Sequence, residues 1–138
     1  MEHSIVCCAV IVNHGLVLVV NRGKAISHAG TWEFPGGKPR EGETMETSVV
    51  RRVHEELDIN IEVVGSIEPY VETALSGKEI EMHAFYARIV GGRLKLFEHQ
   101  RAEWFAPSQL MQLAWPATDI PIIEDIVDRI TKQGKIVV

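Results

Sequence analysis

The chain has few cysteines and no excess of positive charge, and both shortages exclude classes of protein. Its 138 residues include only Cys7 and Cys8, which are adjacent and lack the spacing of metal ligands. We expect both to be buried thiols in a reducing compartment. The formal net charge of -5 gives no field for holding a long polyanion. Duplex nucleic acid is therefore not expected as a partner, whereas a small phosphorylated ligand remains possible.

The sequence also lacks long apolar runs, repeats and low-complexity segments. The apolar stretches near the N-terminus are broken at residues 13–15, and no basic segment precedes them, so neither a signal peptide nor a membrane span is expected. The apolar content of 46% and charged content of 24% are typical of globular proteins. We expect a single cytoplasmic domain over residues 1–138, as a monomer or a homodimer.

The hydrophobic pattern predicts a mixed sheet covered by helices. Residues 4–12 and 16–20 are continuous apolar runs with a glycine-containing turn between them, which is typical of a hairpin buried on both faces. Alternating segments predict further strands at 59–64, 68–73, 80–90 and 102–106, with turns at 76–78 and 91–92. Helical spacing predicts helices at 44–57, 107–113 and 118–134, the last ended by Gly134. The fold class is α/β, with three layers.

Two features point to a site. Residues 22–40 are rich in glycine and proline and are too long for a simple connector, so we expect a functional loop there. Glu55 and Glu56 are adjacent on the helix that follows, and Mg²⁺ is often held by one or two carboxylates together with substrate phosphates. The alternative is a solvated helix face, on which Arg52 pairs with both glutamates.

The spacing of residues from 37 to 59 resembles the Nudix box, in which glycine, glutamate, arginine and paired glutamates recur at fixed intervals. Two positions differ from that pattern. Asp58 stands where the family has glycine, and aspartate tolerates the left-handed backbone better than most residues. Arg52 stands where the family has a glutamate that is a leading candidate for activating water, and arginine cannot accept a proton. The matching residues are Gly37, Glu43, Arg51, Val53, Glu55, Glu56 and Ile59.

Segments 32–38, 82–87, 98–105 and 117–124 extend the resemblance to the mutator-type branch of the Nudix hydrolases. This resemblance implies an α/β/α sandwich with a mixed sheet that hydrolyses a nucleoside triphosphate, of the CTP, dCTP or 8-oxo-dGTP kind, to the monophosphate and pyrophosphate. It implies Mg²⁺ as the cofactor, with Mn²⁺ as a possible substitute. Matching positions imply that Glu55, Glu56 and Glu98 are catalytic metal ligands with the Gly36 carbonyl, and that Gly37, Glu43 and Arg51 have structural roles.

Other residues are candidates for the substrate. Arg22 and Lys38 could meet phosphate oxygens, or could be solvated loop charges. Asp119 lies where the mutator-type branch faces the base, and a carboxylate there can accept from an exocyclic amine; the alternative is a helix N-cap. Phe34 and Phe85 could stack on the base or belong to the core.

Arg52 leaves the activity itself open. A general base typically contributes 10²- to 10⁴-fold, so the resemblance with Arg52 in place predicts slow turnover, and replacing Arg52 by glutamate should raise kcat. One alternative is a nucleotide-binding Nudix domain that is catalytically silent. Another is an RNA 5′ pyrophosphohydrolase, which fits the acidic charge poorly.

Overall fold

The computed structural model describes residues 3–21, 32–97 and 101–136. Within these ranges the helices are α1 (Met45–Leu57), α2 (Pro107–Leu110) and α3 (Ile120–Gln133), and a 3-10 turn, η1 (Ala117–Asp119), precedes α3. The strands are β1 (His3–Asn13), β2 (Leu16–Asn21), β3 (Trp32–Glu33), β4 (Gly36–Gly37), β5 (Ile59–Ser66), β6 (Tyr70–Thr73), β7 (Glu79–Gly92) and β8 (Arg101–Phe105). None of the helices in these ranges is long and apolar enough to span a bilayer.

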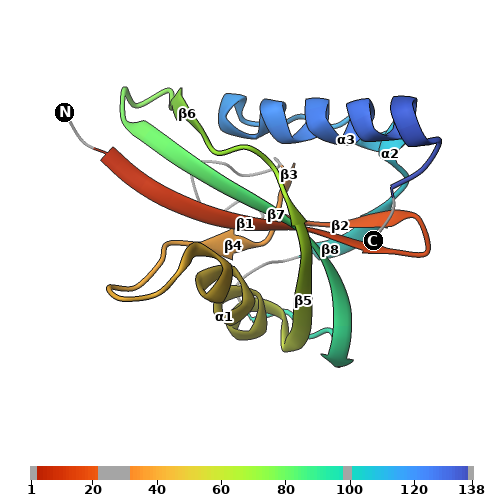
Figure 1. The fold of residues 1–138 in the computed structure, drawn as a ribbon, viewed down its shortest axis with the longest axis horizontal. Coiled ribbons are helices and arrows are strands. Elements are labelled where there is room, and N and C mark those ends of the chain that lie inside the picture. Colours follow the sequence, from red (N-terminus) through yellow and green to blue (C-terminus); the bar gives the residue numbers. More distant parts are fainter. Residues whose placement is uncertain (1–2, 22–31, 98–100, 137–138) are drawn as a thin grey trace.

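The strands form one mixed sheet, as predicted, and β1 and β7 lie at its centre. β1 pairs with β7 in parallel, whereas β1 pairs with β2, and β5 with β7, in the antiparallel direction. The path β3-β2-β1-β7-β5 carries β4, β6 and β8 as additional partners. Figure 1 shows α1 on one face of this sheet and α3 on the other, which confirms the three predicted layers.

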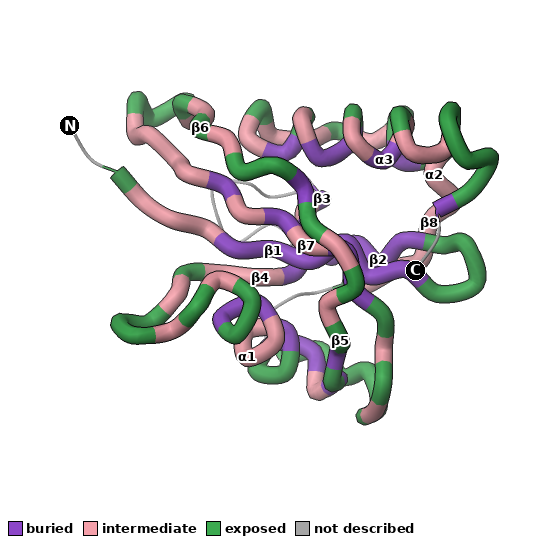
Figure 2. Tube along the Cα trace, in the orientation of Figure 1, coloured by how far each residue is buried: buried purple, intermediate pink, exposed green. Residues whose placement is uncertain are grey.

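The central strand is buried on both faces because its side chains alternate between two core clusters. Cys8, Val10 and Val12 pack on the side of α3, while Cys7, Ala9 and Ile11 pack on the side of α1. Figure 2 shows the second half of this strand as a buried segment at the middle of the molecule, whereas its first residues are exposed or intermediate. The continuous apolar run at residues 4–12 is therefore explained by burial of the strand on both faces.

Helix α1 begins and ends as its sequence predicts. The Thr44 side chain accepts a hydrogen bond from the Thr47 N–H at 3.1 Å, which caps the first turn. Asp58 follows the last turn in the left-handed conformation with φ 58°, where the family pattern has glycine. These caps place residues 51–56 in the second half of the helix, beside β4.

The helix expected over 118–134 begins at Ile120, and the strand expected over 68–73 begins at Tyr70. Three other predictions also differ from the structure. The helix expected over 107–113 is shorter and ends at Leu110. The turn expected at 91–92 is instead the end of β7, where Gly92 pairs with Ile59 at φ 87°, and a Cβ there would collide with the Asp58 carbonyl. The expected loop over residues 22–40 contains the two-residue strands β3 and β4, which are too short for a periodic signal.

Candidate active site

The side chain of Arg52 joins the two adjacent glutamates of α1. Its Nη1 donates to Glu55 Oε1 at 3.0 Å, and its Nη2 lies 3.1 Å from Glu56 Oε1. These are the i, i+3 and i, i+4 pairs that the helix geometry predicts. The solvated-face alternative is nevertheless not what the structure shows, because Glu56 is only 1% exposed.

Strand β4 holds the buried carboxylate from the other side. The Gly36 N–H donates to Glu56 Oε1 at 3.0 Å, so the oxygen that faces Arg52 also receives a backbone hydrogen bond. The Arg52 side chain lies across Gly37, where an added Cβ would collide with Nε and lie 3.1 Å from Cδ. Glycine at this position therefore makes room for arginine.

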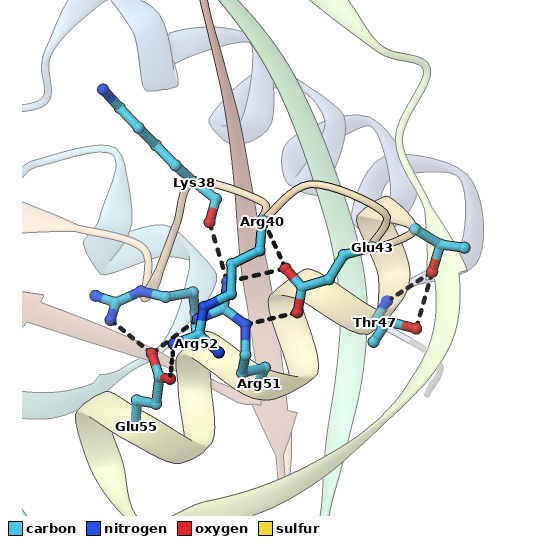
Figure 3. Close-up of polar contacts among 8 residues, drawn as sticks. Lys38, Arg40, Glu43, Thr47, Arg51, Arg52 and Glu55 are labelled. Carbon is cyan, nitrogen blue, oxygen red and sulfur yellow. Dashed lines mark hydrogen bonds and ion pairs between the residues drawn. The ribbon is translucent and has the colours of Figure 1, made fainter.

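Glu43 and Arg51 connect the loop to the helix. Arg51 donates from Nε to Glu43 Oε2 at 2.6 Å and from Nη2 to Glu43 Oε1 at 3.0 Å, a bidentate pair drawn in Figure 3. The Arg51 Nη2 group also donates to the Lys38 carbonyl at 3.1 Å. The hydrogen bonds from Arg51 and from the Arg40 N–H lower the pKa of Glu43 to about 2. This arrangement supports the bracing role expected for Glu43 and Arg51.

Glu55 is surrounded by guanidinium groups. Its Oε1 accepts from Arg51 at 2.9 Å and from Arg52 at 3.0 Å, and its Oε2 accepts from Arg40 at 3.1 Å. The Arg52 hydrogen bond is the largest cause that lowers the Glu55 pKa, followed by that of Arg51. In this arrangement Glu55 is a stable anion and a poor proton acceptor.

A cavity of about 1140 Å³ opens beside these residues. Gly36, Gly37, Lys38 and Arg52 line one part of it, while residues 115–119 between α2 and α3 line another. The Lys38 side chain is exposed and points away from Arg51 and Arg52 (Figure 3). The cavity therefore reaches from Arg52 of α1 to Asp119.

Asp119 is buried in this cavity and is 7% exposed. Although it stands at the N-cap position of α3, its side chain makes no capping hydrogen bond, so the capping alternative is not what the structure shows. Burial, and then the charge of Glu33, raise the pKa of Asp119 to about 7. Near neutral pH this carboxyl group is present in both protonation states, so it can donate as well as accept a hydrogen bond.

The two phenylalanines expected near the base lie on opposite faces of the sheet. Phe34 lines the cavity and stacks on Trp115 with ring centroids 4.8 Å apart and an interplanar angle of 12°. Phe85 packs against the cluster under α1 and is not brought to the cavity. Alternation along β7 places Phe85 opposite its neighbours Ala84 and Tyr86.

Trp115 was missed by sequence reasoning, although it lies in the cavity wall. Its ring is held by a hydrogen bond from Nε1 to the Leu110 carbonyl at 2.8 Å. Its place just before the Pro116–Asp119 segment was a signal for a role in the cavity. Because Trp115 lies outside any helix or strand, the sequence pattern does not predict which way its side chain points.

The described residues supply only some of the oxygen ligands that a hard divalent cation such as Mg²⁺ needs. These hold no group of three or more His, Cys, Asp or Glu side chains placed for a metal ion. Glu55 and Glu56 remain as two carboxylates, which suffice for Mg²⁺ when substrate phosphates complete its coordination. Glu98, the third expected ligand, and Arg22 lie outside the described residues.

Comparison with known proteins gives consistent matches along the chain. The model of the NUDIX domain matches residues 1–126. The CTP pyrophosphohydrolase of Escherichia coli K12 is 34% identical over 119 residues, which is 86% of this chain and 87% of that protein. A Mycobacterium tuberculosis protein, provisionally named 8-oxo-dGTP diphosphatase 2, is 27% identical over 91% of this chain and 89% of its own.

The solved structures agree with these sequences. The solution structure of the E. coli ORF135 protein superposes with a TM-score of 0.83 at 30% identity, covering 96% of this chain and 94% of that one. The MutT NUDIX hydrolase from Burkholderia pseudomallei gives 0.75 at 30% identity, covering 88% and 96%.

Proposed function

Because this chain belongs to the Nudix hydrolase family, we propose that it hydrolyses a nucleoside triphosphate to the monophosphate and pyrophosphate with Mg²⁺. The observation that supports this most is one cavity lined by Arg52, the partner of both carboxylates, and by the buried Asp119 with the stacked aromatic rings. A triphosphate and a base need these two environments. The relative named for CTP makes cytosine nucleotides the first candidates, with 8-oxo-dGTP second.

The triphosphate would bind at the α1 end of the cavity. Glu55 and Glu56 would hold Mg²⁺ with the Gly36 carbonyl, and Lys38 would meet phosphate oxygens. When bound, Mg²⁺ neutralises phosphate charge and activates water. Glu98 and Arg22 are proposed to contribute a further ligand and a phosphate contact, respectively.

Proton transfer would be slow in this site. Arg52 cannot accept a proton, and the lowered pKa of Glu55 makes it a weak acceptor. Proton removal would fall to Glu98 or proceed without a dedicated base, and we expect turnover about 10²- to 10⁴-fold below that of a Nudix enzyme with glutamate at this position.

The base would bind between the aromatic rings and Asp119. The ring of Trp115, already stacked with Phe34, offers an apolar surface for a base. A protonated Asp119 carboxyl group offers a donor beside an acceptor, which complements N3 and N4 of cytosine and also O6 and N7–H of 8-oxoguanine. This donor and acceptor pair fits both bases, so a substrate panel is needed to distinguish them.

The direct test is pyrophosphate release from CTP, dCTP, 5-substituted dCTP and 8-oxo-dGTP with Mg²⁺. We expect release from at least one of them, its loss with chelator, and a loss of about 100-fold or more in Glu56→Gln. The control Glu62→Gln alters an exposed carboxylate paired with Arg88 on the sheet, and should retain activity. Equal rates in wild type and Glu56→Gln would contradict the proposal.

A second candidate function is a nucleotide-binding domain without hydrolysis. The pairing of Arg52 with both glutamates favours it, since a cation of the chain itself already contacts these carboxylates. Tight nucleotide binding with no pyrophosphate above background would support this alternative. Triphosphorylated RNA belongs in the same panel, and we expect no pyrophosphate from it.

A further inference from the structure

Arg52 occupies the space between the two carboxylates that would bind a divalent ion. One of its terminal nitrogens contacts Glu55 at 3.0 Å and the other contacts Glu56 at 3.1 Å. Glu56 is 1% exposed, and burying a carboxylate to this extent is costly without a charged or hydrogen-bonding partner. In this chain the cation at that place is a guanidinium.

The position of the guanidinium is constrained on several sides. The Arg52 stem lies on Gly37, the side chain is 19% exposed, and it lines the cavity with Gly36 and Lys38. Its charge is therefore held in place by two carboxylates at the cavity wall. By contrast, Arg40 pairs with the other oxygen of Glu55 and is 66% exposed.

The charge count changes strongly with this residue. Arg52, Glu55 and Glu56 together carry a formal charge of -1, whereas three glutamates would carry -3. Three converging carboxylates repel one another and favour the binding of more divalent ions. A single negative charge favours fewer.

We propose that the Arg52 guanidinium is a fixed cation that takes the place of one divalent ion between Glu55 and Glu56. The chain would then bind one divalent ion fewer than its Arg52→Glu variant, while the guanidinium itself faces the phosphates. This inference rests on the proposed function, because it concerns the same carboxylates.

The test counts Mn²⁺ ions bound to the full chain without nucleotide, from the loss of the free-ion signal in electron paramagnetic resonance. We expect Arg52→Glu to bind one more ion per chain than wild type. Arg52→Gln removes the charge without adding a carboxylate, and should bind Mn²⁺ roughly tenfold more tightly than wild type. This second variant keeps the inference testable if Arg52→Glu does not fold, as judged by circular dichroism.

Arg40→Glu is the matched control, because it makes the same charge change beside the same glutamate. Since Arg40 does not belong to the described cavity lining, this variant should bind no additional ion. Equal Mn²⁺ counts and affinities in wild type and both Arg52 variants would overturn the inference, as would an equal gain in Arg40→Glu.

The Mn²⁺ counts test the role of Arg52, whereas pyrophosphate release tests the proposed hydrolysis, so the two can fail separately. Pyrophosphate release from wild type with Mg²⁺, combined with equal Mn²⁺ counts in all variants, would overturn the role of Arg52 alone. No Mn²⁺ bound by any variant would overturn it together with the proposed metal site.

Discussion

Asp119 is a residue whose protonation near neutral pH is altered by the fold. Its folded-state pKa is about 7, because the side chain is buried beside the charge of Glu33, while an unfolded aspartate titrates near 3.9. Between these values the folded state binds the proton more tightly, so this group's contribution to stability falls as the pH rises from about 4 to 7. The carboxyl group that we propose for base recognition is thus costly to ionise.

We predict that Asp119→Asn removes this pH dependence. Relative to wild type, the free energy of unfolding of the variant should increase by on the order of 2 to 4 kcal/mol between pH 4 and pH 8, measured by urea unfolding. The control Asp128→Asn changes an exposed aspartate of α3 that pairs with Lys132. Parallel pH profiles for wild type and Asp119→Asn would contradict the prediction.

Gly37 and Arg52 depend on each other sterically. A methyl group at position 37 would meet Nε and Cδ of Arg52, so we predict that Gly37→Ala lowers the free energy of unfolding by about 1 to 3 kcal/mol. In an Arg52→Ala background the same change should cost less than about 1 kcal/mol, because the colliding atoms are gone. Urea unfolding of the four chains measures this coupling, and equal costs in both backgrounds would rule it out.

At the scale of elements, the pair of Glu43 and Arg51 determines how the loop after β4 meets α1. Both side chains are largely buried, at 16% and 18% exposure, and the pair joins two segments that have no regular hydrogen-bonding ladder between them. Arg51 also reaches the Lys38 carbonyl and Glu55. Loss of this pair should therefore loosen the loop that carries Gly36 and Lys38.

We predict that Glu43→Gln lowers the thermal midpoint at pH 7 and that its difference from wild type disappears in acid. The folded pKa of Glu43 is about 2 and an unfolded glutamate titrates near 4.3, so the stabilisation is complete above the unfolded value and is lost as the pH falls toward 2. Glu62→Gln, on an exposed pair with Arg88, should show a smaller effect. A constant difference from pH 7 to pH 3 would contradict this.

The elements themselves were largely readable from the sequence. The run at residues 4–12 predicted a strand buried on both faces, and Thr44 and Gly134 marked the ends of helices correctly. Gly91 and Gly92 misled the turn prediction, because glycine there serves a close approach to the Asp58 carbonyl within a strand. The conformation at Gly92 is determined by this tertiary contact, which a local sequence pattern cannot predict.

For the whole molecule, spacing along the chain predicted the contacts at the α1 end of the cavity better than those at the Asp119 end. Glu43, Arg51, Glu55 and Glu56 lie within one loop and one helix, so their relative positions follow from helix geometry. Trp115 and Phe34 come from segments far apart in the chain, and only the packing of both against the sheet brings them together. A pattern along one segment cannot predict such a contact.

The separation of these two ends gives a final prediction about ligand binding. An α,β-methylene analogue of CTP with Mg²⁺ should stabilise the chain by about 2.7 kcal/mol at 100 times its Kd, seen as an increase of a few degrees in Tm. Glu56→Gln should lose the Mg²⁺-dependent part of the shift, because that residue lies at the carboxylate end. Asp119→Ala should bind the CTP analogue less tightly and keep the Mg²⁺ dependence, since it lies at the other end of the cavity. If both variants lost the Mg²⁺-dependent part equally, the cavity would not be divided into a phosphate end and a base end.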